Sequence, residues 1–479
     1  GRSHAGCVMG SKNLKAIAVR GTKEIHVALP EIFKEIVEEI QKKIKDYPER
    51  GPRLKIGSTH IVAEAAKRGI LGGKNYQTGI LPESNVLWRP EDYTTYLIEG
   101  PTFCGKCLLS SYYGCNITID VKEGKFKGLY IQGAGFSHHV WNWGSKCAIE
   151  SFPAVLKCKE ICNRYGMDQA GPIPFALELF QRGIITREDL DGDELEWGDA
   201  DAIIGMLSKI AHRQGFGDIL ADGSARAAKT IGREAEKYAL TIKGMEMMSG
   251  ADPRGVGMAT NLGHLTCLRG GDDLKTTHTI LENIPNWAKK QGITEENYIR
   301  WFLNRLDMFD GVKKDIYGVP PRVGTSTYTP ESIVLMTKWY EDMTFIREAL
   351  GICLFTVNYT NTIGPTYCAK LFSAYTGLNI SPKEMMKAGE RIVNLIKAFN
   401  IREGLTRVDD DFPSRFYSEP LKKGSSEGAA LSRVYINQLL DTYYRLRGWN
   451  VKTGNPTEEK LGGLGLEDVA EDLIKRKLI

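Results

Sequence analysis

The chain has 479 residues, of which 42% are hydrophobic and 25% charged, an ordinary globular composition that at this length predicts about two to four domains. Its 63 basic and 59 acidic residues leave a formal net charge of +4, which is too weak to indicate a nucleic-acid or membrane-surface protein. No apolar run reaches the roughly 20 residues that a membrane-spanning helix needs.

The first segment, residues 1–28, has no initiator Met and starts in the middle of a sequence pattern. We therefore expect the sequence to be a fragment of a longer chain. It is glycine-rich and then β-like in "LKAIAVRG". From Pro30, "PEIFKEIVEEIQKKIK" has apolar residues at helical spacing and a proline in the first turn. This pattern predicts a helix and a domain boundary near residue 28.

The middle and end of the chain read as one hairpin followed by helices. Residues 117–131 alternate around Glu123-Gly124, which predicts a β-hairpin. In "AIESFPAVLKCKEICNRYG", Gly166 stands where a helix needs a left-handed cap. A glycine-rich break covers residues 249–261. We therefore predict a mainly helical α+β chain with domains 1–28, 29–248 and 249–479, and further helices at 174–182, 200–214, 218–231, 331–349 and 383–399.

Ten cysteines in a chain this long indicate reduced thiols, some holding metal, rather than a disulfide framework, and hence a cytoplasmic protein. The stretch "PTFCGKCLLSSYYGC" places Cys104, Cys107 and Cys115 within fifteen residues. Such a group is typical of three ligands to a 4Fe–4S cluster, which needs a fourth thiolate elsewhere. Zinc binding and unliganded thiols remain alternatives, although no second C-x2-C pair exists for a zinc site.

Two short motifs resemble each other: "NRYGMDQ" from Asn163 and "EALGICL" from Glu348. Each follows a helical run, so each is interpreted as a helix end that turns on glycine. Taken alone, two glycine-capped helix ends are common and need no special function. The residues concerned are Asn163, Gly166, Met167, Asp168, Glu348, Gly351, Ile352 and Cys353.

With their neighbours, these motifs resemble the aldehyde:ferredoxin oxidoreductase family of tungsten enzymes. The resemblance extends to "GCVMGSKNLKAIAV", "WGSKCAIE", "ADPRGVGMATN" and "AFNIREGLTRVDDDFPSRF". It implies the family's domains 2 and 3 with the end of a β-rich domain 1 that covers the pterins. It also implies a tungsten bis-pterin, a 4Fe–4S cluster completed by Cys353, and a magnesium ion between pterin phosphates. Arg2 matches an arginine that contacts pterin phosphate, with backbone groups of Ser3 and His4 beside it.

The chain departs from the family at several places. The cluster motif is normally C-x2-C-x3-C, so the third ligand fits Cys115 only with an insertion. The pterin motifs have Asn163 and Glu348 where the family has Asp. The aldehyde-oxidising members carry a Glu in a stretch that aligns with "QGAGFSHH", which has no carboxylate. Where they have a catalytic His, this chain has Cys267 with His264 displaced.

Without that acid–base pair, the chain is most similar to the tungsten subunit of class II benzoyl-coenzyme A reductases. The resemblance implies reduction of the aromatic ring of an aromatic acyl-CoA in an anaerobic prokaryote. Cys147 is the candidate tungsten ligand, and His138, His139 and His264 are candidate proton donors. A ferredoxin-like iron–sulfur subunit is expected as electron donor, which implies a hetero-oligomer.

Other interpretations remain open from the sequence. The chain could oxidise an aldehyde with ferredoxin, or serve as a non-catalytic iron–sulfur subunit. Trp141 and Trp143, with Phe136, could line a substrate pocket or be core aromatics. Cys158 and Cys162 share a helix face and are read as buried apolar residues rather than a metal pair. Asp252 and Arg254 are either pterin contacts or turn residues.

Overall fold

The computed structural model describes residues 5–46, 62, 65–66, 68–82, 85, 95–102, 116–133, 136–168, 171–248, 252–276, 286–353, 363–424 and 426–479. The chain forms two compact units, and neither is continuous in sequence. Unit 1 comprises Gly1–Gly21, Gly51–Val256 and Phe412–Leu431, and unit 2 comprises Thr22–Arg50, Gly257–Asp411 and Ser432–Ile479. The contiguous domains 1–28, 29–248 and 249–479 stay a prediction, because compactness alone does not fix a domain boundary.

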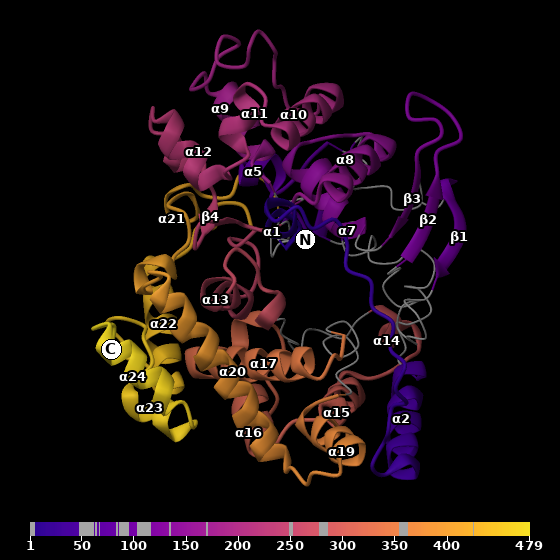
Figure 1. Cartoon of the computed structure of the whole chain (residues 1–479), viewed down its shortest axis with the longest axis vertical. Helices are drawn as coiled ribbons and strands as arrows, with labels where there is room; N and C mark the ends of the chain where they lie inside the picture. The colour runs from indigo at the N-terminus through magenta and orange to yellow at the C-terminus, as the bar shows by residue number, and fades with distance from the viewer. Residues whose placement is uncertain are drawn as a thin grey trace. The chain divides into compact units, whose positions relative to one another are not determined.

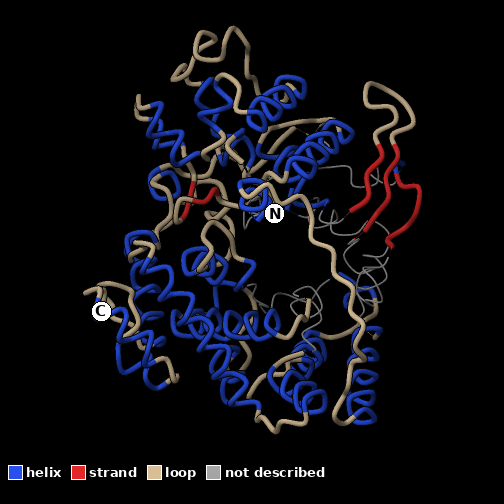
Figure 2. Tube along the Cα trace, viewed as in Figure 1, coloured by secondary structure: helices blue, strands red, loops and turns tan. Residues whose placement is uncertain are grey.

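Helices dominate both units, as the blue tube in Figure 2 shows, and the mainly helical α+β prediction is confirmed. The elements of unit 1 are α1 (Ala5–Ser11), α5 (Gly73–Tyr76), β1 (Leu97–Thr102), β2 (Asn116–Asp120), β3 (Tyr130–Gly133), α7 (Phe136–His139), the π-helix η3 (Val140–Lys146), α8 (Phe152–Tyr165), α9 (Ile173–Gln181), α10 (Ala200–His212), α11 (Phe216–Leu220), α12 (Ser224–Ile231), η4 (Ala235–Tyr238), β4 (Thr241–Ile242), β5 (Met245–Glu246) and α21 (Arg415–Ser418).

The predicted hairpin is confirmed. Strands β2 and β3 are antiparallel with Ile117 opposite Gly133, and β1 adds on the other edge of β2 to complete a three-stranded sheet (Figure 1). Gly124 has φ of 74° in the connecting loop, where a glycine adopts the left-handed turn without steric cost. Residue Ile119 of β2 is fully buried, so one face of this small sheet packs into the core of unit 1.

Unit 2 is almost entirely helical. Its elements are α2 (Pro30–Lys45), α13 (Met258–Thr266), η5 (Leu274–Thr276), α14 (Asn286–Lys290), α15 (Glu295–Arg305), α16 (Asp310–Tyr317), η6 (Thr325–Thr327), α17 (Pro330–Ala349), α19 (Pro365–Thr376), α20 (Pro382–Arg402), η7 (Arg407–Asp409), α22 (Arg433–Arg447), α23 (Glu458–Gly463) and α24 (Glu467–Lys475).

Helix α17 is the centre of unit 2, with α16, α20 and α22 packed against it. It is buried on most sides, so it carries polar residues that must find partners inside the unit. Arg447 of α22 is fully buried and pairs with Glu341 and Asp342 of α17. Tyr443, one turn before Arg447, donates its hydroxyl to the same Glu341. This network fixes α22 on α17.

Two sequence expectations need correction. Residues 14–28 do not form a strand: they run extended, with Ile17 and Val19 exposed, because a β-like sequence forms a strand only where another strand pairs with it. The single helix expected at 218–231 is two helices, α11 and α12. They are separated at Gly223, whose φ of 84° is incompatible with a continuous helix.

Within the part of the chain that is described, no helix has both the length and the apolar character needed to cross a membrane.

Candidate functional site

The segment before Cys147 is a π-helix, a rare conformation that occurs mostly at functional sites. All seven residues of η3 are buried, and the backbone N–H of Cys147 caps it by donating to Asn142 O at 3.2 Å. The thiol of Cys147 is fully buried. Burial raises the pKa of Cys147 far above its usual value, opposed only in part by the nearby charge of Lys146. A soft metal ion is the partner that would bind this thiol as a thiolate.

Three polar atoms of η3 are buried without a hydrogen-bond partner in the described structure. They are the indole Nε1 of Trp141, the amide Oδ1 of Asn142 and the indole Nε1 of Trp143. Buried polar groups in proteins nearly always have partners, so these three atoms need either ordered water or a ligand to satisfy them. Trp141 and Trp143 nevertheless belong to the hydrophobic core of unit 1, as one of the two sequence readings expected.

His138 and His139 end the short helix α7, which runs directly into η3. His138 is half-buried, whereas His139 is 5% exposed. Burial, with smaller contributions from Lys159 and His138, lowers the pKa of His139 well below its usual value. His139 is therefore neutral at pH 7 in this structure, and a neutral imidazole is a weak proton donor. His138 is the better placed of the two for that role.

The end of η3 is fixed by hydrogen bonds to other segments of unit 1. Asn85 donates its amide to Gly144 O at 3.1 Å, and the Ser145 hydroxyl donates to Leu71 O at 2.8 Å. Lys146 is buried, donates to Met247 O at 2.6 Å and lies over the ring of Tyr76 with Nζ 4.7 Å from its centroid. Three consecutive residues before Cys147 are thus held individually.

Tyr76 belongs to a left-handed turn. Lys74, Asn75 and Tyr76 have φ of 49°, 54° and 64°, a conformation that costs an L-residue about 1–2 kcal/mol each. Gly72 precedes them with φ of 61°, and a Cβ there would lie 2.6 Å from the Tyr76 ring, so only glycine fits. Such strain persists only where the surroundings enforce it, and it is concentrated at functional sites.

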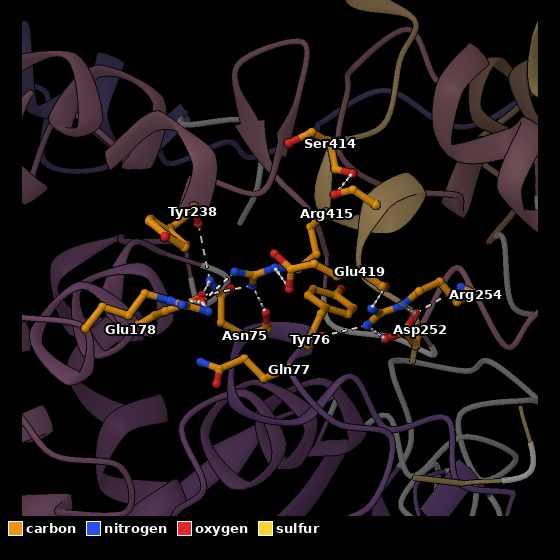
Figure 3. A network of polar contacts seen from close by, with 12 residues as sticks. Asn75, Tyr76, Gln77, Glu178, Tyr238, Asp252, Arg254, Ser414, Arg415 and Glu419 are labelled. Atoms are coloured by element: carbon orange, nitrogen blue, oxygen red, sulfur yellow. Dashed lines mark hydrogen bonds and ion pairs between the residues drawn. The ribbon is translucent and has the colours of Figure 1, made fainter. Parts of the chain in front are cut away.

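Two buried arginines enforce the turn by binding its carbonyl oxygens (Figure 3). Arg415 donates to Asn75 O at 2.7 Å and is paired with Glu178. Arg254 donates to Tyr76 O at 2.6 Å and is paired with Asp252, also at 2.6 Å. All four charged side chains are buried. Asp252 and Arg254 thus support a turn of another segment, and contact with a pterin stays a prediction.

The two glycine turns have the same geometry. Helix α8 ends at Gly166 with φ of 69°, and Gly351 follows α17 with φ of 70°. In the first turn Met167 N donates to Cys162 O at 2.9 Å, and in the second Ile352 N donates to Arg347 O at 2.8 Å. Both bonds span five residues, as in a Schellman motif. The prediction that each motif is a helix C-terminus turning on glycine is confirmed.

The first turn also meets the N-terminal segment. Gly6 of α1 lies against Gly166, where a Cβ on Gly6 would be 3.5 Å from the Gly166 carbonyl oxygen. Asn163 is exposed, and Met167 and Asp168 are half-buried at the edge of the turn. Polar side chains are therefore available around this turn to bind a ligand. Arg2, Ser3 and His4, three of the predicted cofactor-binding residues, lie outside the described residues.

The second turn carries an ion pair that the sequence did not reveal. Glu348 is paired with Lys275, and Cys353, the residue after Ile352, is exposed. Cys353 is thus accessible to a ligand. Its three predicted partners in a cluster, Cys104, Cys107 and Cys115, lie outside the described residues.

His264 is buried in α13 of unit 2, with Nδ1 3.0 Å from Thr260 O. Because a carbonyl oxygen only accepts, Nδ1 carries the hydrogen and Nε2 is the acceptor nitrogen. Beyond it, Cys267 donates its thiol to the buried Asp272 at 3.6 Å, and Arg269 binds that carboxylate too. The Cys267 thiol is thus hydrogen-bonded within unit 2, at the position where the aldehyde-oxidising relatives are expected to have a histidine.

Cys158 and Cys162 are buried in α8 and belong to the apolar core. Burial raises the pKa of Cys162 to about 12, with Asp168 adding to the effect, and the pKa of Cys158 is raised well above its usual value. Among the described residues no cluster of three His, Cys, Asp or Glu side chains could hold a metal ion. Both thiols therefore behave as the small apolar residues that the sequence predicted.

Comparisons with known proteins place this chain in a family of tungsten oxidoreductases. Residues 35–466 match the family model described as "Aldehyde ferredoxin oxidoreductase, domains 2 & 3". The chain is 30% identical over 475 residues to a tungsten-containing aldehyde ferredoxin oxidoreductase of Pyrococcus furiosus, covering 98% of this chain and 69% of that protein. It is 26% identical to "Aliphatic sulfonate oxidoreductase, WOR-like subunit" of the same organism, covering 99% of this chain and 67% of that one.

A solved structure shares the fold. One chain of "Active site complex BamBC of Benzoyl Coenzyme A reductase in complex with 1,5 Dienoyl-CoA" superposes with a TM-score of 0.77 at 24% identity, over 99% of this chain and 70% of that chain. The fold and site define an oxidoreductase of the tungsten class. The chain belongs to the aldehyde ferredoxin oxidoreductase family and comprises its domains 2 and 3.

The tungsten–pterin cofactor of this family fits the residues present. Cys147 offers a buried soft donor, and the neighbouring indole N–H groups and amide oxygen await polar partners. The two glycine turns offer exposed polar side chains. Cys147 and the first turn lie in unit 1, and the second turn lies in unit 2.

Proposed function

We propose that this protein is a tungsten subunit of the benzoyl-CoA reductase type, which reduces an aromatic acyl-CoA by two electrons and two protons to a cyclohexadiene-carboxyl-CoA. The observation that carries this proposal is the sealed environment of Cys147. The thiol is fully buried, and no Asp or Glu occurs between Gln132 and Cys147, where aldehyde-oxidising relatives are expected to carry their catalytic carboxylate. The shared fold with a benzoyl-CoA reductase chain supports it.

The tungsten bis-pterin supplies a low-potential centre that delivers electrons to the ring. In this chain Cys147 would hold the metal through its thiolate, and the Trp141 and Trp143 indoles would donate hydrogen bonds to the cofactor. Asn163, Asp168 and Glu348 would bind pterin, with Gly166, Met167, Gly351 and Ile352 shaping the turns. Arg2, with backbone groups of Ser3 and His4, would bind pterin phosphate, together with a magnesium ion.

The chain's own contribution is to exclude water and to deliver protons. The apolar walls around η3 keep water away from the reducing centre, which would otherwise lose its electrons to protons. His138 is the candidate that gives a proton to the ring, and His264 offers an acceptor nitrogen for proton exchange. His139, neutral in its buried place, holds its N–H for hydrogen bonding rather than for proton transfer.

Cys104, Cys107, Cys115 and Cys353 would hold a 4Fe–4S cluster, which would supply electron transfer to the site. The exposed position of Cys353 supports this assignment, because a cluster ligand must be accessible before assembly. A small ferredoxin-like subunit passes the electrons to the cluster, so that the working enzyme is a hetero-oligomer. Iron and tungsten analysis distinguishes it from a non-catalytic iron–sulfur subunit, which contains iron alone.

The test is an anoxic assay of the full-length, cofactor-loaded protein. Oxidation of a low-potential reduced dye is followed with benzoyl-CoA, and reduction of an oxidised dye is followed with aldehydes in parallel. The expected result is turnover with benzoyl-CoA and none with aldehydes. Turnover with aldehydes alone would overturn the proposal.

Aldehyde oxidation by ferredoxin is the second candidate. It is favoured by the 30% identity to curated aldehyde ferredoxin oxidoreductases of Pyrococcus furiosus and Pyrococcus abyssi, each over 98% of this chain. It requires a catalytic acid and base other than those that the family places at residues 132–139 and 267. His264, four residues and one helical turn from Thr260 in α13, is the side chain that would then carry that role.

A further inference from the structure

We propose that the left-handed turn Lys74–Tyr76, gripped by Arg254 and Arg415, is the device that positions Cys147. The inference rests on the proposed function in one respect, the role of Cys147 as tungsten ligand. We assign Arg254, Arg415 and Tyr76 as positioning residues, because they act on Cys147 through other residues and not on the reacting atoms. All of the contacts involved lie within unit 1.

The first step is the grip itself. Each arginine binds one carbonyl oxygen of the turn, Asn75 O for Arg415 and Tyr76 O for Arg254. Each is held in place by its own buried carboxylate, Glu178 or Asp252 (Figure 3). A planar guanidinium can bind a carboxylate and a carbonyl at once with fixed geometry, which a lysine ammonium cannot. The grip therefore fixes the direction of the turn as well as its place.

The second step is what the turn holds. The Tyr76 hydroxyl donates to Met248 O at 3.0 Å, and its ring lies under the ammonium of Lys146. Lys146 donates to the adjacent carbonyl, Met247 O. The ring of Tyr76 also meets Phe416, the residue after Arg415, edge-on at 5.3 Å. Tyr76 is thus held in place on several sides. Lys146, whose ammonium lies over the Tyr76 ring, is the residue immediately before Cys147.

The third step is that η3 alone does not fix its own end. This π-helix is a single short segment, and hydrogen bonds to residues outside it hold its last three residues. Two of those contacts come from residues 71–85, the segment that contains the turn: Leu71 accepts from Ser145, and Asn85 donates to Gly144. A backbone strained into the left-handed region and fixed by buried charges is stiff, which a metal ligand requires.

One test perturbs the backbone of the turn and leaves the charges alone. Lys74 is half-buried, so substitution there leaves no buried group without its partner. Lys74→Gly keeps the left-handed conformation readily, whereas Lys74→Val, β-branched, opposes it. Two readouts are taken on the anaerobic holoenzyme: the W(V) electron paramagnetic resonance spectrum, and the rate of native alkylation of Cys147 measured by peptide mass.

The expected result is an unchanged spectrum and alkylation rate for Lys74→Gly. Lys74→Val is expected to give a shifted spectrum and at least a tenfold faster alkylation. The buried Cys368 of unit 2 is the internal reference, and its alkylation stays unchanged in both variants. Identical spectra and alkylation rates for the two variants would overturn the proposal.

A second test addresses the arginines with a matched control. Arg254→Lys and Arg415→Lys remove the forked contacts to the turn. Arg447→Lys removes an equally buried arginine from the carboxylates of unit 2. All three are expected to lower the melting temperature, but only the first two shift the W(V) spectrum and expose Cys147. Equal effects of all three on both readouts would show a merely structural role.

The two readouts separate this inference from the proposed function. If Cys147→Ser leaves the W(V) spectrum unchanged, Cys147 is not the tungsten ligand and the proposed role fails. The alkylation rate still reports whether the turn positions the thiol, whatever the metal does.

Discussion

At Cys147 the protein gives one side chain two opposed properties. The thiol is sealed from water, which holds its proton on, yet it stands next to the lysine whose charge favours the thiolate. The metal ligation proposed for Cys147 would resolve the conflict, because a metal ion replaces the proton. The polar atoms of Trp141, Asn142 and Trp143 that have no hydrogen-bond partner lie on the residues just before it.

Removing the thiol of Cys147 separates this role from packing. We expect Cys147→Ala to lower benzoyl-CoA-dependent turnover by more than about 100-fold, because second-sphere changes alone cost 10–100-fold and this one removes a direct ligand. Cys158→Ala is the matched control, since it removes an equally buried sulfur from the same core and keeps the activity. Equal activity of the two variants would remove Cys147 from the site.

His139 predicts a pH dependence of stability. Its pKa is lowered in the folded protein, so below the unfolded value of about 6.5 the unfolded chain binds the proton that the folded chain refuses. Stability is therefore full above pH 6.5 and falls as the pH drops below it, by up to about 1.4 kcal/mol per pH unit. Denaturant unfolding of the wild type and of His139→Gln between pH 7.5 and 5.5 checks this. The variant should lose the dependence, and an identical slope would contradict the assignment.

At the scale of elements, the helix ends are the part that the sequence predicted best. Gly166 and Gly351 follow apolar helical runs, and glycine at a helix end has one dominant use, the left-handed cap. The hairpin around Glu123-Gly124 was equally readable from its alternation. The π-helix was not, because "VWNWGSK" has no turn signal and its extra residue per turn depends on contacts from residues 71–85.

The left-handed turn shows the other limit of sequence reasoning. Gly72, Gly73 and Asn75 are turn signals, but nothing in the sequence indicates that Lys74 and Tyr76 are left-handed as well. What determines their conformation is a pair of arginines, one of them more than 300 residues later in the chain. Lys146, Glu178 and Arg415 were missed in the sequence for the same reason: their role is defined by partners distant along the chain.

The left-handed cap makes a quantitative prediction. In Gly351→Ala the new Cβ meets nothing within 4 Å, so the cost is backbone strain alone, about 1–2 kcal/mol of unfolding free energy. Gly311→Ala, in α16 with equally free surroundings but ordinary helical φ, should instead stabilise by about 0.5–1 kcal/mol. Chemical denaturation of both variants measures the difference, and shifts of the same sign would contradict it.

On the scale of the whole molecule, the chain leaves unit 1 after Val256 and returns to it at Phe412. The returning segment is short but contains Arg415, which is 1% exposed and pairs with the fully buried Glu178. Sequence reasoning expected contiguous domains, since composition marks where a segment changes character and does not mark a segment that returns.

Arg415→Met tests how far unit 1 depends on this return. It leaves the Glu178 carboxylate buried without its main partner, which typically costs 3–5 kcal/mol of unfolding free energy. Lys422→Met, on the same returning segment but exposed, should change it by less than about 0.5 kcal/mol. Unfolding followed at unit 1 tryptophans such as Trp143 compares the two. A loss below about 1 kcal/mol for Arg415→Met would show that unit 1 is complete without the segment.

The same return has a consequence for biosynthesis. Arg415 is translated 237 residues after Glu178. At 5–20 residues per second the ribosome needs roughly 12–47 s to deliver it. Until then a nascent unit 1 has Arg254 to bind Tyr76 O, but it lacks the guanidinium that binds Asn75 O and pairs with Glu178. Because the proposed role of Cys147 depends on this turn, we expect tungsten to be inserted only after Arg415 has been translated, which gives a chaperone that interval in which to hold the chain open.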